Sequence, residues 1–372
     1  MPLPFRIALI GGGAGIAATH LEAIAATPGA LLVGLSDLSA ERVGLRAAAA
    51  GVPAFADHRA MLDALRPDLA VICTPHPSHA ALARDCFEAG AHVLVEKPLA
   101  VSVSEADAMI AAAQAAGRTL AVAFQQRFRP EIERARALIE SGELGELVRV
   151  HCIEPWFRTA AYYRSAGWRG SWSGEGGGVL MNQAPHTLDL LCHLAGRPAR
   201  VWGVTRTLRH AIETEDTAHA LLEFANGAPG YLFVTTAEAG AQSLEIIGDR
   251  AALHLARGRL TVTRFQPSQQ TQMRESPESF AAPQTSTEEL RSEGVGPTGH
   301  TAVYHDLLAA LAGGRPPRCD GESARDSLEL ANALTLSSQL GRAVELPIDR
   351  AAYDTLLAEL RAGMKKVGGT HG

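Results

Sequence analysis

The chain has 372 residues, of which 47% are hydrophobic and 20% charged, and its formal net charge is −6. A single hydrophobic core stops growing at roughly 250 to 300 residues, so this length predicts two domains. The negative net charge argues against a nucleic-acid partner and favours a small ligand. The five cysteines are scattered without a C-x-x-C pair, and neither a signal-peptide pattern nor a membrane-spanning apolar run is present, so we expect a cytoplasmic protein without a membrane partner.

Residues 1–124 carry the pattern of a doubly wound domain. Five apolar runs, RIALIG, ALLVGLS, DLAVICT, AHVLVE and TLAVAF, alternate with alanine-rich helical stretches. Nearly continuous apolarity is typical of parallel strands that are covered on both faces. Ser102 and Glu105 form a capping box for one predicted helix, and Gly117 ends it. We therefore predict an α/β fold with an N-terminal Rossmann domain.

Residues 125–372 have a different texture and predict a second domain of α+β type. The segments LVRVHCIEPW, ARVWGVTRTL, TAHALLEF, APGYLFVTTA and SLEIIG alternate between apolar and polar residues, as antiparallel strands do. Residues 265–300 are rich in Gln, Ser, Pro, Thr and Glu. We expect them to form a long, exposed and partly disordered loop.

A glycine-rich segment, GGGAGIAATH, follows the first predicted strand and begins the first helix. At this position glycines let backbone amides approach a dinucleotide pyrophosphate at a helix N-terminus. The strict G-x-G-x-x-G is not met in any register, and the alternative is a tight strand-to-helix corner. The residues predicted to contact the cofactor here are Gly11, Gly13, Ala14, Gly15 and Ile16.

Asp37 ends the second predicted strand, where a carboxylate would accept hydrogen bonds from an adenosine ribose. This favours NAD, because a 2′-phosphate would meet a like charge. Ser39 and Arg42 lie close enough in the sequence to leave NADP open. The alternative for Asp37 is a carboxylate at a helix start.

Two further stretches carry a family resemblance: CTPHPSHAALARDCFEAGAHVLVEKPLA (73–100) and GGGVLMNQAPHTLDLLCHLAG (176–196). These stretches contain the motifs T-P-x-x-x-H, A-G-x-H-V-x-x-E-K-P and G-G-G-x-L…H-x-x-D in this order, after the glycine loop. From about residue 5 to about residue 345 the chain resembles the Gfo/Idh/MocA family. The resemblance implies a Rossmann domain, a C-terminal domain with a large, mostly antiparallel open sheet, NAD(P)-dependent chemistry on sugars or cyclitols, and homodimers or homotetramers.

The resemblance also implies roles in the first domain. In the family, Glu-Lys-Pro supplies a lysine that touches the reacting hydroxyl, often beside a cis proline, and this role falls on Lys97 and Pro98. The strand that carries them ends where active sites of doubly wound sheets lie. The predicted cofactor contacts beyond the glycine loop and Asp37 are Thr74, Pro75, His79, Glu96, Lys97 and Gln125.

His186 is the second predicted catalytic residue, since alcohol oxidation needs a base and imidazole suits neutral pH. The family has an aspartate four residues earlier, where this chain has Asn182. An amide holds a hydroxyl but takes no proton, so proton removal falls on His186. Asp189 has two alternatives, a ligand contact or the orientation of a helix. The spacing of His76 and His79 suggests a metal, but no acidic or thiol set completes a site, and we expect none.

Residues 155–178 are dense in aromatic and arginine residues, which bind sugars through ring faces and planar hydrogen-bonding groups. Tyr163, Trp168 and Arg169 are predicted substrate contacts, together with Lys97, Asn182 and His186. For Trp156 and Trp172, a place in the hydrophobic core is an equally good interpretation. Gln125 and Arg127 resemble the family's N-x-R-[FY] segment, which reaches the cofactor or substrate cleft. The alternative for Arg127 is an interdomain ion pair.

The sequence thus predicts a dehydrogenase that passes hydride between a sugar, sugar-derivative or cyclitol carbinol and NAD, with NADP left open. Lys97 polarises the oxygen and His186 is the acid or base. Two alternatives stay open: a glycosidase that retains NAD and oxidises the sugar transiently, and a dinucleotide-sensing protein without catalysis.

Overall fold

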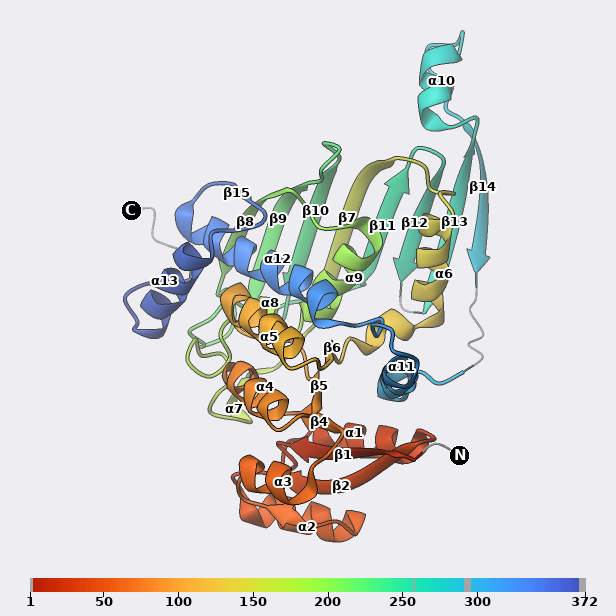
Figure 1. Cartoon of the computed structure of the whole chain (residues 1–372). Helices are drawn as coiled ribbons and strands as arrows, with labels where there is room; N and C mark the ends of the chain where they lie inside the picture. The colour runs from red at the N-terminus through yellow and green to blue at the C-terminus, as the bar shows by residue number, and fades with distance from the viewer. Residues whose placement is uncertain (1–2, 257, 291–295, 368–372) are drawn as a thin grey trace. The chain divides into compact units, whose positions relative to one another are not determined.

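The computed structural model describes residues 3–256, 258–290 and 296–367 (Figure 1). Packing divides the chain into two units. The first contains the chain up to Gln125, Ser173–Gly176 and Gly296–Leu328, and the second contains the remainder. The first segment of the first unit ends at Gln125, and residues 173–176 and 296–328 pack with it. None of the helices in the described ranges is both long and apolar enough to cross a membrane.

The first unit is built on a six-stranded parallel sheet in the order β3-β2-β1-β4-β5-β6. The strands are β1 (Phe5–Ile10), β2 (Ala30–Ser36), β3 (Ala54–Phe55), β4 (Leu69–Ile72), β5 (His92–Val95) and β6 (Leu120–Val122). All five predicted strands are confirmed, and every residue of β4 and β6 is buried. The two-residue β3 is too short to show in a hydrophobic pattern.

Helices connect the strands of this sheet and complete the Rossmann topology. They are α1 (Ala17–Ala26), α2 (Ala40–Ala50), α3 (His58–Leu65), η1 (His76–Ser78), α4 (His79–Glu88) and α5 (Val103–Ala115). The α5 boundaries confirm the capping box, because the Ser102 side chain accepts from the Glu105 N–H and Gly117 follows the end with φ +62°. A later helix, α11 (Gly299–Gly313), packs against α1, which explains why this segment belongs to the first unit.

The second unit contains a nine-stranded, mostly antiparallel sheet in the order β14-β13-β12-β11-β7-β10-β9-β8-β15. Within the described part of this sheet, only β7 and β10 pair in parallel. Its strands are β7 (Leu147–Pro155), β8 (Arg200–Arg206), β9 (Thr217–Glu223), β10 (Pro229–Thr235), β11 (Ser243–Gly248), β12 (Ala251–Ala256), β13 (Arg259–Gln266), β14 (Gln284–Leu290) and β15 (Val344–Glu345). The structure confirms the large open sheet that the resemblance implied.

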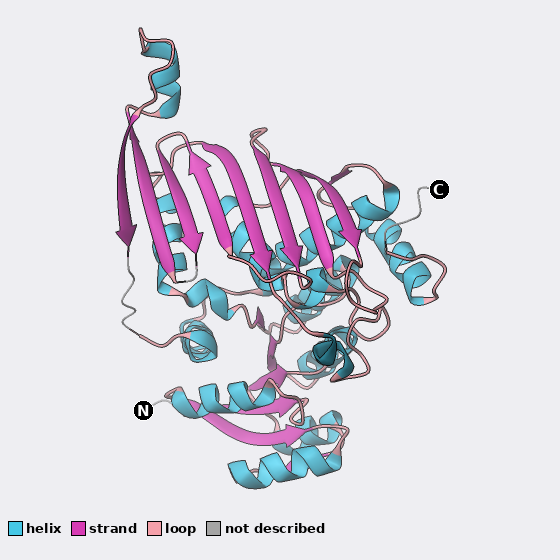
Figure 2. Cartoon of the chain, turned by 180° about the vertical axis from the view of Figure 1, so that it is seen from behind, coloured by secondary structure: helices cyan, strands magenta, loops and turns pink. Residues whose placement is uncertain are grey.

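Helices cover one face of the nine-stranded sheet, and the view from behind shows the strands of the other face uncovered (Figures 1 and 2). The remaining helices are η2 (Gln125–Phe128), α6 (Pro130–Glu140), α7 (Ala160–Arg164), α8 (Val179–Asn182), α9 (Pro185–Ala195), α10 (Gln269–Glu275), α12 (Gly321–Leu340) and α13 (Arg350–Arg361). The uncovered side, which we call the open face, carries a row of neighbouring side chains: Trp202, Leu221, Tyr231 and His151. Trp202 is 53% exposed and Leu221 is 59% exposed.

The prediction that residues 265–300 form a loop is wrong for much of this segment. Helix α10 occupies Gln269–Glu275, and β14 pairs with β13 as an edge strand over Gln284–Leu290. Nearly every residue of β14 is exposed, so no apolar alternation marks the strand in the sequence. Cross-strand polar contacts accompany the pairing, including Thr263 with Thr287 and Arg264 with Glu288. Residues 291–295 lie outside the described part of the chain.

Candidate functional site

In the first unit, the segments predicted to bind the cofactor follow the ends of parallel strands. The glycine loop comes after β1, Asp37 after β2, Thr74 after β4, Lys97 after β5 and Gln125 after β6. Because these strands are parallel, all five segments lie at the carboxyl edge of one sheet. The strand order reverses between β1 and β4, which is the position where doubly wound sheets bind ligands.

The glycine loop has the backbone that a pyrophosphate site needs. Gly11 has φ +87°, and a Cβ there would lie 2.9 Å from the carbonyl carbon of Cys73, so only glycine fits. At Gly15 a Cβ would meet no heavy atom within 4 Å, and the residue is exposed. Helix α1 follows Ile16, whose side chain has no group that caps the first turn. The amides of this turn therefore suit an anionic group.

Asp37 ties the second strand to the glycine loop. Its carboxylate accepts hydrogen bonds from the backbone N–H groups of Gly13 and Ser39, each at 2.8 Å. Ser39 is the N-cap of α2, so the helix-start alternative is also supported. Arg46 in α2 donates to the carbonyl oxygens of Gly12 and Ala14 and holds the loop from the other side. Sequence reasoning missed Arg46, because nothing in the pattern pairs it with the loop.

His79 joins two of the predicted cofactor segments. Its Nδ1 lies 2.9 Å from the carbonyl oxygen of Pro98, and its Nε2 lies 2.9 Å from that of Thr74. Burial lowers the pKa of His79, and a neutral imidazole donates to only one of these oxygens. Burial also holds the pKa of His76 well below its ordinary 6.5, and its Nδ1 lies 3.0 Å from the Glu175 carbonyl oxygen. Both imidazoles thus contact backbone oxygens, and a cofactor contact by His79 stays a prediction.

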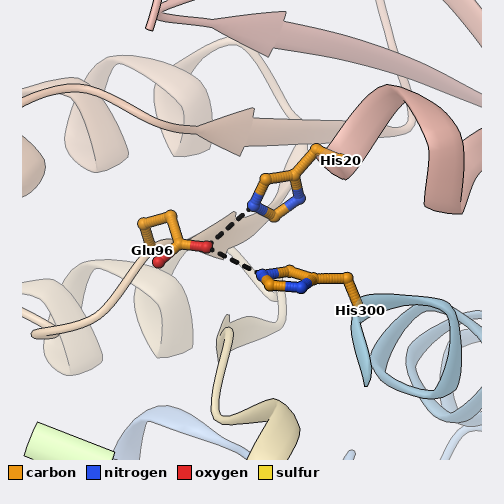
Figure 3. Close-up of side chains that lie close together, drawn as sticks. All are labelled: His20, Glu96 and His300. Carbon is orange, nitrogen blue, oxygen red and sulfur yellow. Dashed lines mark hydrogen bonds and ion pairs between the residues drawn. The ribbon is translucent and has the colours of Figure 1, made fainter. Parts of the chain in front are cut away.

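Glu96 lies in a buried polar cluster that the sequence did not predict (Figure 3). Oε1 of Glu96 lies 2.9 Å from Nε2 of His20 and 3.1 Å from Nε2 of His300. His20 comes from α1 and His300 from α11, and Nδ1 of His20 lies 2.8 Å from the hydroxyl of Tyr304. The second oxygen of Glu96 accepts from the backbone N–H of Lys97 at 3.1 Å.

This cluster keeps a carboxylate charged in the interior. Burial alone raises the pKa of Glu96, but the hydrogen bonds from His20 and His300 outweigh it and hold the pKa well below its ordinary 4.5. The three ligand atoms lie within 4.8 Å of one another and are of the kinds that bind zinc, yet the hydrogen bonds between them already satisfy one another. The cluster therefore fixes the residue that precedes Lys97. The Lys97–Pro98 peptide is cis, as the resemblance implied.

In the second unit, the segment around His186 is held by a glycine turn. A Cβ at Gly178 would lie 1.8 Å from the carbonyl oxygen of Glu215, so no other residue fits. The backbone N–H groups of Gly178 and Leu180 donate to Oε1 of Glu215 at 2.9 and 3.0 Å. Asn182 ends α8, and the half-buried His186 is the second residue of α9. The turn thus fixes the start of α8, the short helix that precedes the helix of the predicted base.

Asp189 and Arg127 form an ion pair that is buried within the second unit. Nη2 of Arg127 lies 2.5 Å from Oδ1 of Asp189, and Nε lies 2.9 Å from Oδ2. Their side chains are 3% and 0% exposed. For Arg127 the structure supports the alternative of an ion pair, although both partners belong to the second unit and the pair is therefore not interdomain. For Asp189 it supports the alternative of orienting a helix. A substrate contact by Arg127 stays a prediction.

Replacing Arg127 by methionine should lower the free energy of unfolding by about 3 to 5 kcal/mol, because it leaves the Asp189 carboxylate buried without its guanidinium. Arg127→Met with Asp189→Leu should recover part of this loss. As a control, Arg149→Met removes an exposed pair with Glu245 and should cost less than about 1 kcal/mol. Urea unfolding of the variants measures these values, and equal losses for Arg127→Met and Arg149→Met would contradict the expectation.

A second polar group, which we call the Tyr162 cluster, surrounds the ring of Tyr162. It consists of Trp156, Arg158, Tyr162, Arg169 and Gln183. The Tyr162 hydroxyl accepts from Gln183 Nε2 at 2.8 Å, from Asn182 Nδ2 at 3.2 Å and from Arg169. The guanidinium of Arg169 also lies over Trp168, 4.5 Å from its ring centroid. Of the predicted substrate contacts, Arg169 belongs to the cluster, and Asn182 and Trp168 contact its members.

Tyr163, in contrast, contacts the interior of the second unit. It is 9% exposed, its hydroxyl lies 2.8 Å from Oγ1 of Thr236, and its ring packs on His210. Adjacent residues of the short helix α7 point in different directions, so Tyr162 rather than Tyr163 meets Arg169. The paired tyrosines were visible in the sequence, but nothing there distinguished one from the other.

Comparisons with known proteins agree with this architecture. Residues 5–124 match the model described as "Oxidoreductase family, NAD-binding Rossmann fold", and residues 132–254 match the "GFO/IDH/MocA C-terminal domain". The chain is 38% identical over 200 residues to 1-carboxy-3-chloro-3,4-dihydroxycyclo hexa-1,5-diene dehydrogenase of Comamonas testosteroni. This match covers 53% of this chain and 49% of that protein. It is 28% identical over 356 residues to D-apiose dehydrogenase of Paraburkholderia graminis, covering 92% and 90%.

A solved structure covers the chain more completely. The WlbA dehydrogenase of Bordetella pertussis, in complex with NADH and UDP-GlcNAcA, is 30% identical with a TM-score of 0.79, covering 93% of this chain and 100% of that one. Matches to several curated relatives, by contrast, span less than two thirds of their lengths. The sequence segments, the two sheets and the full-length structural match lead to one conclusion: the chain belongs to the Gfo/Idh/MocA family of oxidoreductases and has an N-terminal NAD-binding Rossmann domain.

Proposed function

We propose that the protein is an NAD-dependent dehydrogenase that acts on a ring CH–OH group of a sugar, sugar derivative or cyclitol. The observation that carries the proposal is that each unit retains the group this reaction needs. Lys97 follows β5 at the carboxyl edge of the Rossmann sheet, and His186 lies in the first turn of α9. The relatives include sugar dehydrogenases and a dehydrogenase of a carboxylated ring diol, and these activities support the substrate class.

The first unit provides groups that fit the cofactor. The amides of the glycine loop and of the first turn of α1 suit the pyrophosphate, and Asp37 suits the adenosine ribose. Oε1 of Gln125 is buried and has no hydrogen-bond partner among the described residues, so it is an acceptor for an N–H donor of a bound ligand. When bound, the nicotinamide accepts the hydride.

The catalytic roles follow from the chemistry of the side chains. The ammonium of Lys97 donates to the substrate oxygen and stabilises the negative charge that develops as its proton leaves. The imidazole of His186 takes that proton, since imidazole is a common general base in catalysis. Asn182 holds a substrate hydroxyl without exchanging a proton, because an amide has no titratable group at neutral pH. In the reverse direction His186 returns the proton.

A substrate panel tests the proposed activity. Sugars, inositols, sugar acids and 1,6-anhydrosugars are incubated with NAD and with NADP, and nicotinamide absorbance is followed. We expect NADH to accumulate with at least one class, and NAD to be preferred by about tenfold or more because Asp37 repels a 2′-phosphate. Cleavage of glycosides without net NADH would instead favour the NAD-retaining glycosidase, and binding of NAD without any turnover would favour the sensing protein.

We also propose that the protein forms dimers or tetramers through the open face. An aromatic and aliphatic row that includes the exposed Trp202 and Leu221 is a surface that association would cover. The mass in solution, measured by light scattering, tests this, and a monomer at micromolar concentration would contradict it.

A cytoplasmic location is the related proposal for the cell. All five cysteines are free thiols in the structure, and four of them are buried. This suits a reducing compartment. Fractionation of cells that express the protein tests the location, and recovery outside the cytoplasm would contradict it.

A further inference from the structure

Two guanidinium groups of the Tyr162 cluster lie over the same ring. The Cζ of Arg169 is 4.2 Å from the ring centroid of Tyr162, and the Cζ of Arg158 is 5.2 Å from it. Both arginines are partly buried. Neither forms an ion pair with an acidic side chain anywhere in the described ranges, unlike Arg127 in the same unit. Two like charges close to one ring repel each other, and an anion beside them would offset this repulsion.

Acidic groups in the adjoining segment are held by other partners. The Asp216 carboxylate accepts from the backbone N–H groups of Leu208, Arg209 and His210 at 2.8 to 3.0 Å. Burial alone raises the pKa of Asp216, but these backbone hydrogen bonds outweigh it and lower the pKa. Oε1 of Glu215 accepts from Gly178 and Leu180. Asp216 also lies 3.0 Å from Nδ1 of His210. Within the described residues neither carboxylate forms an ion pair with Arg158 or Arg169, so neither supplies a counter-charge to the two arginines.

The cluster also contains buried polar atoms without partners. Gln183 is 6% exposed, and its Oε1 has no hydrogen-bond partner among the residues that the structure describes, although its Nε2 donates to Tyr162. In the same described set, Nε of Arg169 and Nε1 of Trp156 are buried donors without an acceptor. Buried polar groups are nearly always satisfied in folded proteins, so unsatisfied donors and an unsatisfied acceptor in one cluster indicate a polar ligand.

We propose that the substrate is an acid, namely a ring polyol that bears a carboxylate, and this inference rests on the proposed function. Arg158 and Arg169 bind the carboxylate beside Tyr162. Guanidinium groups match the planar geometry of a carboxylate and can bond it through two N–H groups at once. The Gln183 acceptor and the Asn182 amide would then take ring hydroxyls. The aromatic rings of Trp156 and Tyr162 supply faces for the C–H surface of the ring.

Binding to matched pairs tests the proposal independently of turnover. Titration calorimetry on NADH-loaded protein compares D-glucuronate with D-glucose, and D-galacturonate with D-galactose, with D-glucose 6-phosphate as a third arm. Each acid should bind at least about tenfold more tightly than its neutral partner and more tightly than the phosphate, because a fixed charge pair adds to the hydroxyl contacts. Equal affinity within both pairs, preference for the phosphate, or no measurable binding of either acid would overturn the proposal.

Variants locate the effect. Arg169→Gln and Arg158→Gln should each weaken binding of the acid by about tenfold, and the preference for each acid over its neutral partner should fall by a similar factor. Arg164→Gln is the matched control, because Arg164 is an exposed arginine of the same segment, at the end of α7. The loss should be absent in this control. A loss of acid binding in Arg164→Gln equal to that in Arg169→Gln would show a general charge effect and contradict the assignment.

The binding experiment is repeated with Lys97→Met to separate this inference from the proposed function. If Lys97→Met binds the acid selectively but turns over like the unaltered protein, the catalytic role of Lys97 is wrong and the acid site stands. If Lys97→Met is inactive but acids and neutral sugars bind equally, the proposed chemistry stands and the acid site is wrong.

Discussion

Lys97→Met is expected to lower kcat by about 10² to 10³-fold, while the dissociation constant of NADH changes by less than about threefold. Methionine keeps an unbranched side chain of similar reach, so the fold of the turn after β5 has no reason to change. The ammonium, however, is lost, and removal of one donor to a developing oxyanion costs a factor of this size. Steady-state kinetics with the substrate found in the panel, together with NADH fluorescence titration, measure the two quantities.

Two controls accompany this prediction. Lys365→Met removes a lysine that pairs with Glu359 near the C-terminus, and it should leave kcat unchanged. Lys97→Arg keeps the charge but carries it on a broad, planar group, so it should retain only part of the activity. A Lys97→Met enzyme with unaltered kcat would remove Lys97 from the mechanism.

Glu96→Gln is expected to lower the free energy of unfolding at neutral pH by about 3 to 5 kcal/mol, as expected for one partner lost from a buried charged network. In the native protein one oxygen of Glu96 accepts from His20 and His300, and the other accepts from the Lys97 N–H. The amide of glutamine has one acceptor atom and one donor atom. With its NH₂ group toward Lys97, the glutamine meets a backbone N–H donor and loses that hydrogen bond. With its NH₂ group toward the histidines, both hydrogen bonds are kept only if both imidazoles change tautomer.

The same substitution should change the response to acid. The pKa of Glu96 in the folded protein lies well below 4.5, its ordinary value. Stability from this carboxylate is therefore complete above about pH 4.5 and is lost as the pH falls through the folded-state pKa. Urea unfolding should show a smaller acid-induced loss in Glu96→Gln than in the native protein. Glu88→Gln, at an exposed position, should keep the native dependence, and parallel curves for all three proteins would contradict the buried cluster.

The first unit was largely predictable because its signals are local. Strands covered on both faces give continuous apolar runs, and β1, β2, β4, β5 and β6 follow these runs. The capping box placed the start of α5 for the same reason. Parallel strands also bring their carboxyl ends to one edge, so the predicted residues Asp37, Thr74 and Lys97 lie at the same edge of the sheet.

The contacts that were missed depend on residues far apart in the sequence. His300 is 204 positions from Glu96, and no spacing rule relates a residue of α11 to the end of β5. Tyr162 and Tyr163 are adjacent and chemically identical, so only the geometry of α7 separates the contact of one with Arg169 from that of the other with Thr236. The edge strand β14 lacks a buried face and therefore lacks the apolar alternation that reveals strands.

We propose that Lys97 and His186 act on one substrate oxygen beside the nicotinamide. A crystal structure of the NADH complex tests it most directly. We predict that Nζ of Lys97 and a ring nitrogen of His186 lie on the same side of the nicotinamide, within about 6 Å of each other, so that one oxygen can bond to both. If the two nitrogens lie on opposite sides of the ring, or face separate cavities, the proposed mechanism is contradicted.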